Sequence, residues 1–386
     1  MQDTAPTAQI QSATINEEAL SRLWFFFASI PDTRGSQGIR YSLPIILMQT
    51  LCALCCGFDT YAALAQWSRE YAAEIKLHAP CLANHYPDAT TFFRVLSTLD
   101  VLALEKNLAI WVTGYTPVLD GEAVAVDGKT TAGNTLHLVA VIAHKLKSVL
   151  FQEGTTTKGK ELVVAPKVLA QIDIKSKVVT ADALHTHKPF CADIVARGGG
   201  YVLTVKDNQR LLKQDLEYYF KNLPADVAHP CYSQSEKSHG RFEKRMLIMS
   251  TDLNSYLKDW PGITHVFKLE RLRDTKGVIQ TETVYGIARL LPDFDTVKHL
   301  FDYIRGHWLI ENRIHRQRDV MLHEDANTAR KGKGPHVMSS LRNIVTTVFN
   351  QQPKVSFSYQ QRHYAAHLPD LFAILGLSSA KRTVYC

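Results

Sequence analysis

The spacing of apolar residues changes near residue 120 and divides the chain into two regions of different predicted structure. Before that point apolar residues recur at helical spacing over residues 16–30, 43–57, 59–75 and 88–115. Asn16, Asp59 and Asp88 stand where a helix N-cap is expected. Residues 1–115 are therefore predicted to form an all-helical N-terminal domain.

Short β-rich runs begin after residue 120. The first three, residues 122–130, 136–144 and 147–156, follow one another with turn residues between them, which predicts antiparallel strands. Helical and strand patterns then alternate up to residue 223. Because three strands precede the first helix of this region, the pattern favours an α/β fold with a mixed sheet over a doubly wound βαβ fold.

A second group of β-rich stretches, residues 238–250, 263–274 and 278–290, interrupts this alternation and predicts a β-rich insertion at 225–300. The helical pattern resumes at residues 295–315. The expected organisation is thus an α/β domain at 116–350 that contains the insertion, followed by a C-terminal tail at 351–386.

Charge is distributed unevenly between these regions. The whole chain has a net charge of +7, but residues 1–120 contain 7 Lys+Arg and 11 Asp+Glu, so the remainder has a net charge of +11. A basic second region indicates a polyanionic partner, and the alternative is an ordinary basic surface. At 46% hydrophobic and 21% charged residues, the composition is that of a globular protein.

Cysteine usage and the apolar runs indicate a reduced, cytoplasmic protein. Cys52, Cys55 and Cys56 lie in an apolar run without a second Cys pair or a nearby histidine, so we expect buried core residues rather than a metal or redox site. The N-terminal residues MQDTAPTAQIQ do not resemble a signal peptide, and the longest apolar run is too short and too interrupted for a membrane span.

Acidic residues follow two of the predicted strands. Asp127 ends the apolar run AVAVD and Asp182 ends VVTAD, and ligand groups converge at the carboxyl ends of strands in open α/β sheets. Glu311, on a later helix, can supply a third carboxylate. Such oxygen ligands favour Mg²⁺ or Mn²⁺ over zinc, and two ions about 3.5–4 Å apart catalyse in-line phosphodiester displacement. The alternative is that each aspartate is a turn or cap residue.

The stretch HWLIENRIHRQRD, residues 307–319, surrounds that glutamate with cations. On an α-helix His307, Glu311, His315 and Arg318 share one face, and Ile310, Ile314 and Met321 lie on another. The first face can present a metal-binding carboxylate beside phosphate-holding groups while the second packs. The alternative is a solvated basic helix with an incidental Glu–His pair.

Eight segments together carry a resemblance to a known family: IPDTRGSQGIRYSL, CGFDTYAALAQWSREY, DATTFFRVLSTLD, AVDGKT, VVTADALHTHK, YVLTVKDNQRLL, SHGRFEKR and HWLIENRIHRQRDVMLHEDANTARKGKGP. Over nearly its whole length the chain resembles bacterial insertion-sequence DDE transposases of the H-repeat-associated branch. The resemblance implies an RNase H-like mixed-sheet catalytic core with a β-rich insertion. It also implies that Asp127, Asp182 and Glu311 bind two Mg²⁺ or Mn²⁺ ions.

The chain departs from the family pattern at several positions outside these three acids. His307 stands where an arginine precedes the glutamate, Arg318 where a lysine follows it, and Ile304 where a tyrosine is usual. His187 replaces a glutamine, and Gly159 with Lys160 replaces a serine and an asparagine. Since all three acids are present, the chain resembles an intact enzyme.

The implied partner is double-stranded DNA, bound at element ends and at the target by a homo-oligomer assembled on DNA in the nucleoid. Phosphate contacts of this kind make binding depend on salt without specifying sequence. The alternative for Lys129 is a turn cap, and for the other candidates a solvated surface. The candidate DNA or phosphate contacts are Lys129, Lys206, Asn208, Gln209, Arg241, Arg305, His307, Arg313, His315 and Arg318.

Three functions fit the sequence. The leading hypothesis is a transposase that cleaves strands at element ends and transfers them. The alternatives are a domesticated DNA-binding protein that no longer transposes, and a metal-dependent nuclease that cuts without joining. The net negative charge of the N-terminal region favours an assembly or scaffold role for it, and no recognition-helix pattern is found there.

Overall fold

A computed structural model describes residues 23–378, apart from 36, 38, 116, 132–135, 156, 158, 224–227, 239–240, 311–313 and 353–354. The predicted cap Asn16 lies outside these residues. Within the described part of the chain, no helix combines the length and apolar composition needed to cross a bilayer.

Within the described residues, one mixed sheet of nine strands forms the centre of the molecule, in the order β3-β2-β1-β4-β5-β9-β8-β7-β6. Strand β2 runs antiparallel to both β1 and β3, β1, β4 and β5 are parallel, and the remaining neighbours are antiparallel. The predicted mixed sheet is confirmed. The strands are β1 (Ala123–Thr131), β2 (Leu136–Ala143), β3 (Ser148–Thr155), β4 (Val178–Ala181), β5 (Gly200–Val205), β6 (Cys231–Ser238), β7 (Arg241–Ser250), β8 (His265–Thr275) and β9 (Val278–Arg289).

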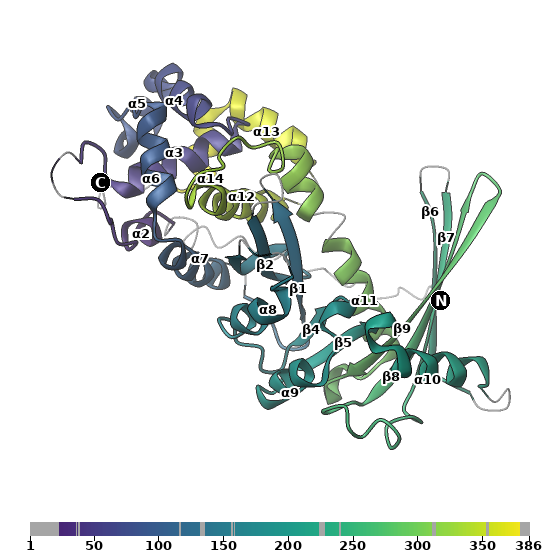
Figure 1. Cartoon of the computed structure of the whole chain (residues 1–386). Coiled ribbons are helices and arrows are strands. Elements are labelled where there is room, and N and C mark those ends of the chain that lie inside the picture. Colours follow the sequence, from purple (N-terminus) through teal and green to yellow (C-terminus); the bar gives the residue numbers. More distant parts are fainter. Residues whose placement is uncertain are drawn as a thin grey trace, which may run out of the picture.

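The β-rich stretch predicted as an inserted sheet is instead an extension of the central sheet. Strand β9 pairs with β5 from Tyr201↔Arg289 to Val205↔Tyr285, which continues the ladder without a break. The stretch also contains four strands rather than three, because the polar segment CYSQSEKS forms β6. The long strands β6–β9 project from the end of the molecule opposite the N-terminal helices (Figure 1).

Helices cover both faces of the sheet. The apolar faces of α8, α9 and α10 share a core with Val124, Val126 and Val179 on one side, while α11 packs on Ala123 and Val178 on the other. Short 3₁₀ turns η2 (Ala183–His185) and η3 (Asp207–Gln209) follow β4 and β5. The helices are α8 (Glu161–Leu169), α9 (Lys188–Ala196), α10 (Arg210–Lys221) and α11 (Val297–Ile310).

The N-terminal region is helical, as predicted. Asp88 caps α6 by accepting a hydrogen bond from the backbone N–H of Thr91, but α4 is capped by Thr60 and not by Asp59. Cys52, Cys55 and Cys56 are buried in this helical core, as expected. The helices are α2 (Leu23–Ala28), α3 (Leu43–Cys55), α4 (Tyr61–Glu70), α5 (Ala72–His78), α6 (Ala89–Thr98) and α7 (Val101–Tyr115).

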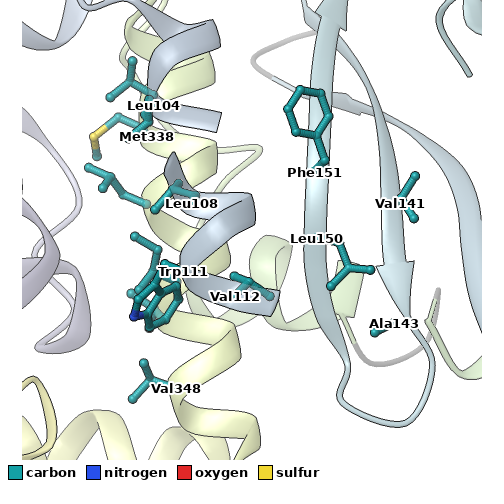
Figure 2. Close-up of a cluster of buried hydrophobic side chains, with 14 of the residues drawn as sticks. Leu104, Leu108, Trp111, Val112, Val141, Ala143, Leu150, Phe151, Met338 and Val348 are labelled. Atoms are coloured by element: carbon teal, nitrogen blue, oxygen red, sulfur yellow. The ribbon is translucent and has the colours of Figure 1, made fainter. Parts of the chain in front are cut away.

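The N-terminal helices and the sheet share one hydrophobic core. Figure 2 shows Leu104 of α7 beside Met338 of α12, and Leu150 and Phe151 on the neighbouring strand β3, all in the same core cluster. Helix α12 (Gly334–Asn350) contacts α3, α6, α7 and β3, so it joins the two regions.

The segment predicted as a C-terminal tail forms two further helices, α13 (Phe357–Ala366) and α14 (Leu368–Ile374). Both contact α3, and α14 also contacts α5. Leu371 and Phe372 are fully buried in the N-terminal core. The end of the chain therefore completes the helical region with which it begins, as the yellow and purple helices of Figure 1 show.

Candidate active site

Asp127 and Asp182 lie at the ends of two adjacent strands. Parallel strands β1 and β4 pair up to Val126↔Ala181, so each aspartate comes one residue after this last pair. Neighbouring strands lie about 4.8 Å apart, which brings the two carboxylates to the same edge of the sheet. The structure thus brings together the two strand-end acids singled out from the sequence.

Both aspartates belong to the face of the sheet that α11 covers. Ala125, two residues before Asp127, packs against Ile310 and Ile314 in a small separate core. Side chains two apart in a strand share a face, so Asp127 points toward the chain that continues from α11. The predicted packing of Ile310 and Ile314 is confirmed.

Asp127 is held by two hydrogen bonds. Its Oδ1 accepts from the backbone N–H of Gly128 at 2.8 Å, and its Oδ2 pairs with Nε2 of His315 at 2.7 Å. Burial raises the pKa of Asp127, but the hydrogen bond and charge of His315 and the charge of His307 outweigh this, so the pKa lies below its ordinary value. Asp127 is therefore held as a carboxylate that faces a histidine.

Asp182 is the more accessible of the two acids. Its side chain is 58% exposed, and Nε2 of the buried His185 lies 3.9 Å from its Oδ1. Its side chain also accepts from the backbone N–H of Leu184 at 3.2 Å and so caps the turn η2. Burial lowers the pKa of His185, although the negative charge of Asp182 opposes this shift.

Asn208 and Gln209 fix the turn that carries Asp182. The side-chain amide of Asn208 donates to the carbonyl oxygen of Ala183 at 2.6 Å, and that of Gln209 donates to the carbonyl oxygen of Thr186 at 2.9 Å. The two residues were predicted as DNA contacts. In the structure their amide donors tie η3 to η2, the turn that follows Asp182, and the DNA contact stays a prediction.

His307 is the third predicted residue beside the acids. Oγ1 of Thr180 hydrogen-bonds with Nδ1 of His307 at 3.0 Å and with Nε2 of His144 at 2.8 Å. Burial and the nearby His307 lower the pKa of His144 to about 3, so this imidazole is neutral at physiological pH. His144 and Thr180 were missed in the sequence, although His144 directly follows a buried strand, as Asp127 follows an apolar run.

Gly306 allows α11 to lie close to His144 at the end of β2. A Cβ atom built on Gly306 would lie 2.2 Å from Nδ1 of His144. Any other residue would therefore push α11 away from the sheet or displace the imidazole. The Thr180–His307 hydrogen bond depends on that close approach.

Arg318 does not lie on the face that α-helical spacing predicts for it. Residues Gln317–Met321 form a π-helical turn, in which Leu322 N–H donates to the carbonyl of Gln317. The wider turn moves Arg318 off the face of His307 and His315 and into the interior. There its Nε and Nη2 donate to the Glu324 carboxylate, both at 2.8 Å. Its guanidinium is therefore not available to a phosphate.

Lys129 also has acidic partners within the protein. Its Nζ pairs with Asp319 and lies 3.8 Å from Glu324 and 3.7 Å from Asp325. Only 9% of its side chain is exposed. The ion pairs argue against the phosphate contact and show that Lys129 anchors the segment that follows α11.

The remaining predicted contacts are spread over the molecule. Arg305 donates to both carboxylate oxygens of Glu236 on β6, at 3.0 and 2.9 Å. Lys206 is exposed just before η3, and Arg241 is exposed at the start of β7 in the projecting strands. The structure therefore leaves Lys206 near the acids and places Arg241 on a different element.

Two sequence families match this chain. The family described as "Transposase DDE domain" matches residues 118–348, and the one described as "DDE_Tnp_1-associated" matches residues 24–112. The chain belongs to the DDE transposase family.

Individual relatives agree with this assignment. The DDE transposase is 29% identical over 341 residues to "Putative transposase YncI" of Escherichia coli O157:H7, which covers 84% of this chain and 86% of that protein. It is 26% identical over 343 residues to "H repeat-associated putative transposase YhhI" of Escherichia coli strain K12, covering 85% and 90%. The predicted H-repeat-associated resemblance is confirmed.

A solved structure of piggyBac transposase in a synaptic complex with hairpin DNA is also similar, with a TM-score of 0.43 and 10% identity. The match covers 99% of this chain and 86% of that chain.

Not every predicted site residue of this DDE transposase can be placed. Glu311 and Arg313 lie outside the described residues. Among the described residues, no three His, Cys, Asp or Glu side chains are grouped so that they could hold a metal ion. Asp127 and Asp182 nevertheless provide two oxygen donors at one edge, which is the donor type that Mg²⁺ and Mn²⁺ prefer.

One further carboxylate lies near this edge. A Cβ atom built on Gly128 would lie 3.3 Å from the carboxyl carbon of Glu161, at the start of α8. Glu161 was not singled out in the sequence, because it begins a helix and does not follow a strand. Successive residues of a strand point to opposite faces, so Glu161 lies on the face of β1 opposite to the Asp127 side chain.

Proposed function

We propose that this DDE transposase cleaves DNA strands at element ends and transfers them, with Asp127, Asp182 and Glu311 as the catalytic acids. The observation that carries the proposal is the placement of Asp127 and Asp182 one residue past the pair Val126↔Ala181 on parallel strands. Glu311 directly follows Ile310, which packs beside Ala125 on the same face of the sheet.

An RNase H-like core is part of this proposal. The order β3-β2-β1-β4-β5, with three antiparallel strands followed by parallel ones and helices on both faces, supports it. In such a sheet the first and fourth strands are neighbours. Residues 55 positions apart in sequence can therefore act on one substrate.

Mg²⁺ or Mn²⁺, as two ions, is the cofactor we propose. Bound divalent ions would activate a water or a 3′-hydroxyl and stabilise the leaving oxygen of the phosphodiester. Asp127 and Asp182 would hold them with Glu311. In the structure His315 pairs with Oδ2 of Asp127, and this hydrogen bond would orient the carboxylate as a ligand.

The chain's own residues supply orientation and charge. Asn208 and Gln209 hold the turn of Asp182, and Thr180 holds His307 beside the acids. The net charge of +11 on the residues after 120 supports double-stranded DNA as the partner. We further propose that the protein acts as a homo-oligomer assembled on DNA in the nucleoid.

The test is a strand-cleavage and transfer assay on DNA that carries the sequences flanking this gene, with Mg²⁺ or Mn²⁺. We expect nicking at the element boundary that requires the metal and falls at least about 100-fold in Asp182→Asn, because the variant loses a charged ligand. Asp274→Asn is the matched control, since Asp274 also accepts a backbone N–H in a turn but lies in the β8–β9 hairpin.

The products distinguish the possible functions. Joined strands identify a transposase, whereas cleavage without joining identifies a nuclease. Tight, salt-sensitive binding without cleavage under either metal would contradict the proposal and indicate a domesticated DNA-binding protein.

A further inference from the structure

The N-terminal helical region contains a groove lined by arginines. Residues 34, 35, 37 and 39–41, together with helix α6, line a cavity of about 760 Å³. Arg34, Arg40 and Arg94 line it, together with the aromatic side chains of Tyr86 and Phe93, which are 36% and 37% exposed. Guanidinium groups beside exposed aromatic rings are the side chains that nucleic acids favour.

Among the described residues, two acids lie near this groove, and only one of them has a cationic partner. The Asp32 carboxylate pairs with Arg34 at 2.6 Å, and Asp88 accepts hydrogen bonds from Thr90 and Thr91. Within the part of the chain that the structure describes, Arg40 and Arg94 form no ion pair, and Arg40 stacks over the ring of Tyr41. These two guanidinium groups are therefore available to an anion.

A second basic segment adjoins the groove. The backbone N–H of Lys333 donates to the carbonyl of Ser97 at 2.9 Å, and Ser97 lines the groove. Gly332 has a φ of +59° and comes so close that a Cβ there would lie 2.5 Å from the same carbonyl oxygen. The exposed side chains of Arg330, Lys331 and Lys333 thus extend the positive surface beyond α6.

This basic segment is connected to the candidate active site by a fixed stretch of chain. The stretch begins beside Asp127, where Asp319 pairs with Lys129. It is then fastened to the helical region, because His323 pairs with Asp59 at 3.0 Å and Asn327 donates to the Asp59 carbonyl at 3.3 Å. A duplex held at the groove would therefore have a defined position relative to the acids.

We propose that Arg40 and Arg94 of this groove, extended by Arg330, Lys331 and Lys333, bind the phosphate backbone of the element-end duplex whose strand is cleaved. The identity of this DNA rests on the proposed function. A DNA-binding role replaces the scaffold role expected from the net negative charge of the region. The reason is that phosphate contacts depend on local charge: Arg34 neutralises Asp32, and the remaining cations of the groove and of the adjoining segment outnumber Asp88.

The test compares two triple variants that remove equal charge. The groove variant carries Arg40→Gln, Arg94→Gln and Lys331→Gln. The control carries Lys76→Gln, Lys221→Gln and Lys258→Gln, three exposed lysines for which the structure shows no ion pair to a described residue. Binding of fluorescent duplexes is measured without metal ions at several salt concentrations, on an element-end duplex and on an unrelated duplex of equal length.

We expect the groove variant to bind the element end on the order of 10- to 100-fold more weakly, with a salt slope smaller by about 3, one for each lost phosphate contact. The loss on unrelated DNA should be smaller, because only the element-end complex has one fixed register. The control should stay within about threefold of the wild type, and all three proteins should melt alike.

Two results would overturn the inference. Unchanged binding by the groove variant would exclude the groove as a DNA surface, and an equal loss on both duplexes would exclude the element end as its occupant. A different result would contradict the proposed function: the wild-type protein would not cleave the element end with either metal.

Discussion

At the residue scale, the buried ion pair between Arg318 and Glu324 is the contact on which the edge of the site depends most. Arg318 is 1% and Glu324 3% exposed, and Ser339 also accepts from the guanidinium, at 2.6 Å. The same carboxylate lies 3.8 Å from Nζ of Lys129, two residues from Asp127. Glu324 therefore stabilises both the π-helical turn and the strand that carries the first acid.

Glu324→Gln should destabilise the fold by about 3–5 kcal/mol, because it leaves the Arg318 charge buried without a counter-charge. Urea unfolding followed by circular dichroism measures this loss. The control is Glu217→Gln, which removes an exposed partner of Lys213 on α10 and should cost less than about 0.5 kcal/mol. Equal effects of the two substitutions would contradict the structural role of Glu324.

The same pair gives the stability a defined dependence on pH. Burial raises the pKa of Glu324, but the positive charges of Arg318, Arg342 and Lys129 outweigh it and hold the pKa at about 2, below its ordinary value of 4.5. As the pH falls, the Glu324 carboxylate is therefore protonated near pH 4.5 in the unfolded chain but only near pH 2 in the folded protein. Stability from this group is complete above pH 4.5, falls as the pH drops toward 2, and is absent in Glu324→Gln.

At the scale of elements, the distance between α11 and the sheet is set by Gly306. Gly306→Ala improves helix propensity by about 1 kcal/mol, but its Cβ would lie 2.2 Å from Nδ1 of the buried His144. We expect the clash to dominate, with a net loss of about 1–3 kcal/mol and a fall in strand cleavage as α11 shifts. Thermal melting and the cleavage assay measure the two effects.

Gly114→Ala is the matched control, because Gly114 lies in α7 and a Cβ there would meet nothing within 4 Å. It should leave the melting temperature unchanged or raise it slightly. If both variants were destabilised equally, the absence of a side chain at Gly306 would not be what allows α11 to lie close to His144.

The sequence predicts the helices and strands that are determined by their own residues. It does not predict those whose conformation depends on contacts with residues far along the chain. Asp127 and Asp182 could be located because an acid after an apolar run marks the end of a strand. Arg318 was misplaced because its predicted face assumed 3.6 residues per turn, and the π-helical turn changes that phase. Strand β6 was missed because its polar residues form a strand only by pairing with β7.

Side-chain roles show the same limit. Nothing in the segment YVLTVKDNQRLL indicates that Asn208 donates to the carbonyl of Ala183, since that acceptor follows a different strand. The cations of the groove are also far apart in sequence, from Arg34 to Lys333. Its positive surface exists only after α6 and the segment before α12 have come together.

At the scale of the whole molecule, the two ends of the described chain stabilise one another. Helices α13 and α14 contact α3, and α12 packs on both α7 and β3, so the helical region and the sheet are not independent units. A substitution that destabilises α13 or α14 should therefore also destabilise the N-terminal helices and, through α12, the sheet.

Phe372→Ala tests this coupling, because Phe372 is fully buried among residues of the N-terminal core. The cavity should cost about 3–5 kcal/mol, and faster amide exchange should appear in α3 and α5, about 300 residues earlier in the chain. Hydrogen exchange measured by mass spectrometry makes the comparison. The control is Tyr359→Ala, because the Tyr359 side chain on α13 is 55% exposed and leaves no buried cavity when it is removed. Faster exchange confined to α13 and α14 would instead mean that the C-terminal helices are stabilised locally and that the N-terminal helices fold without them.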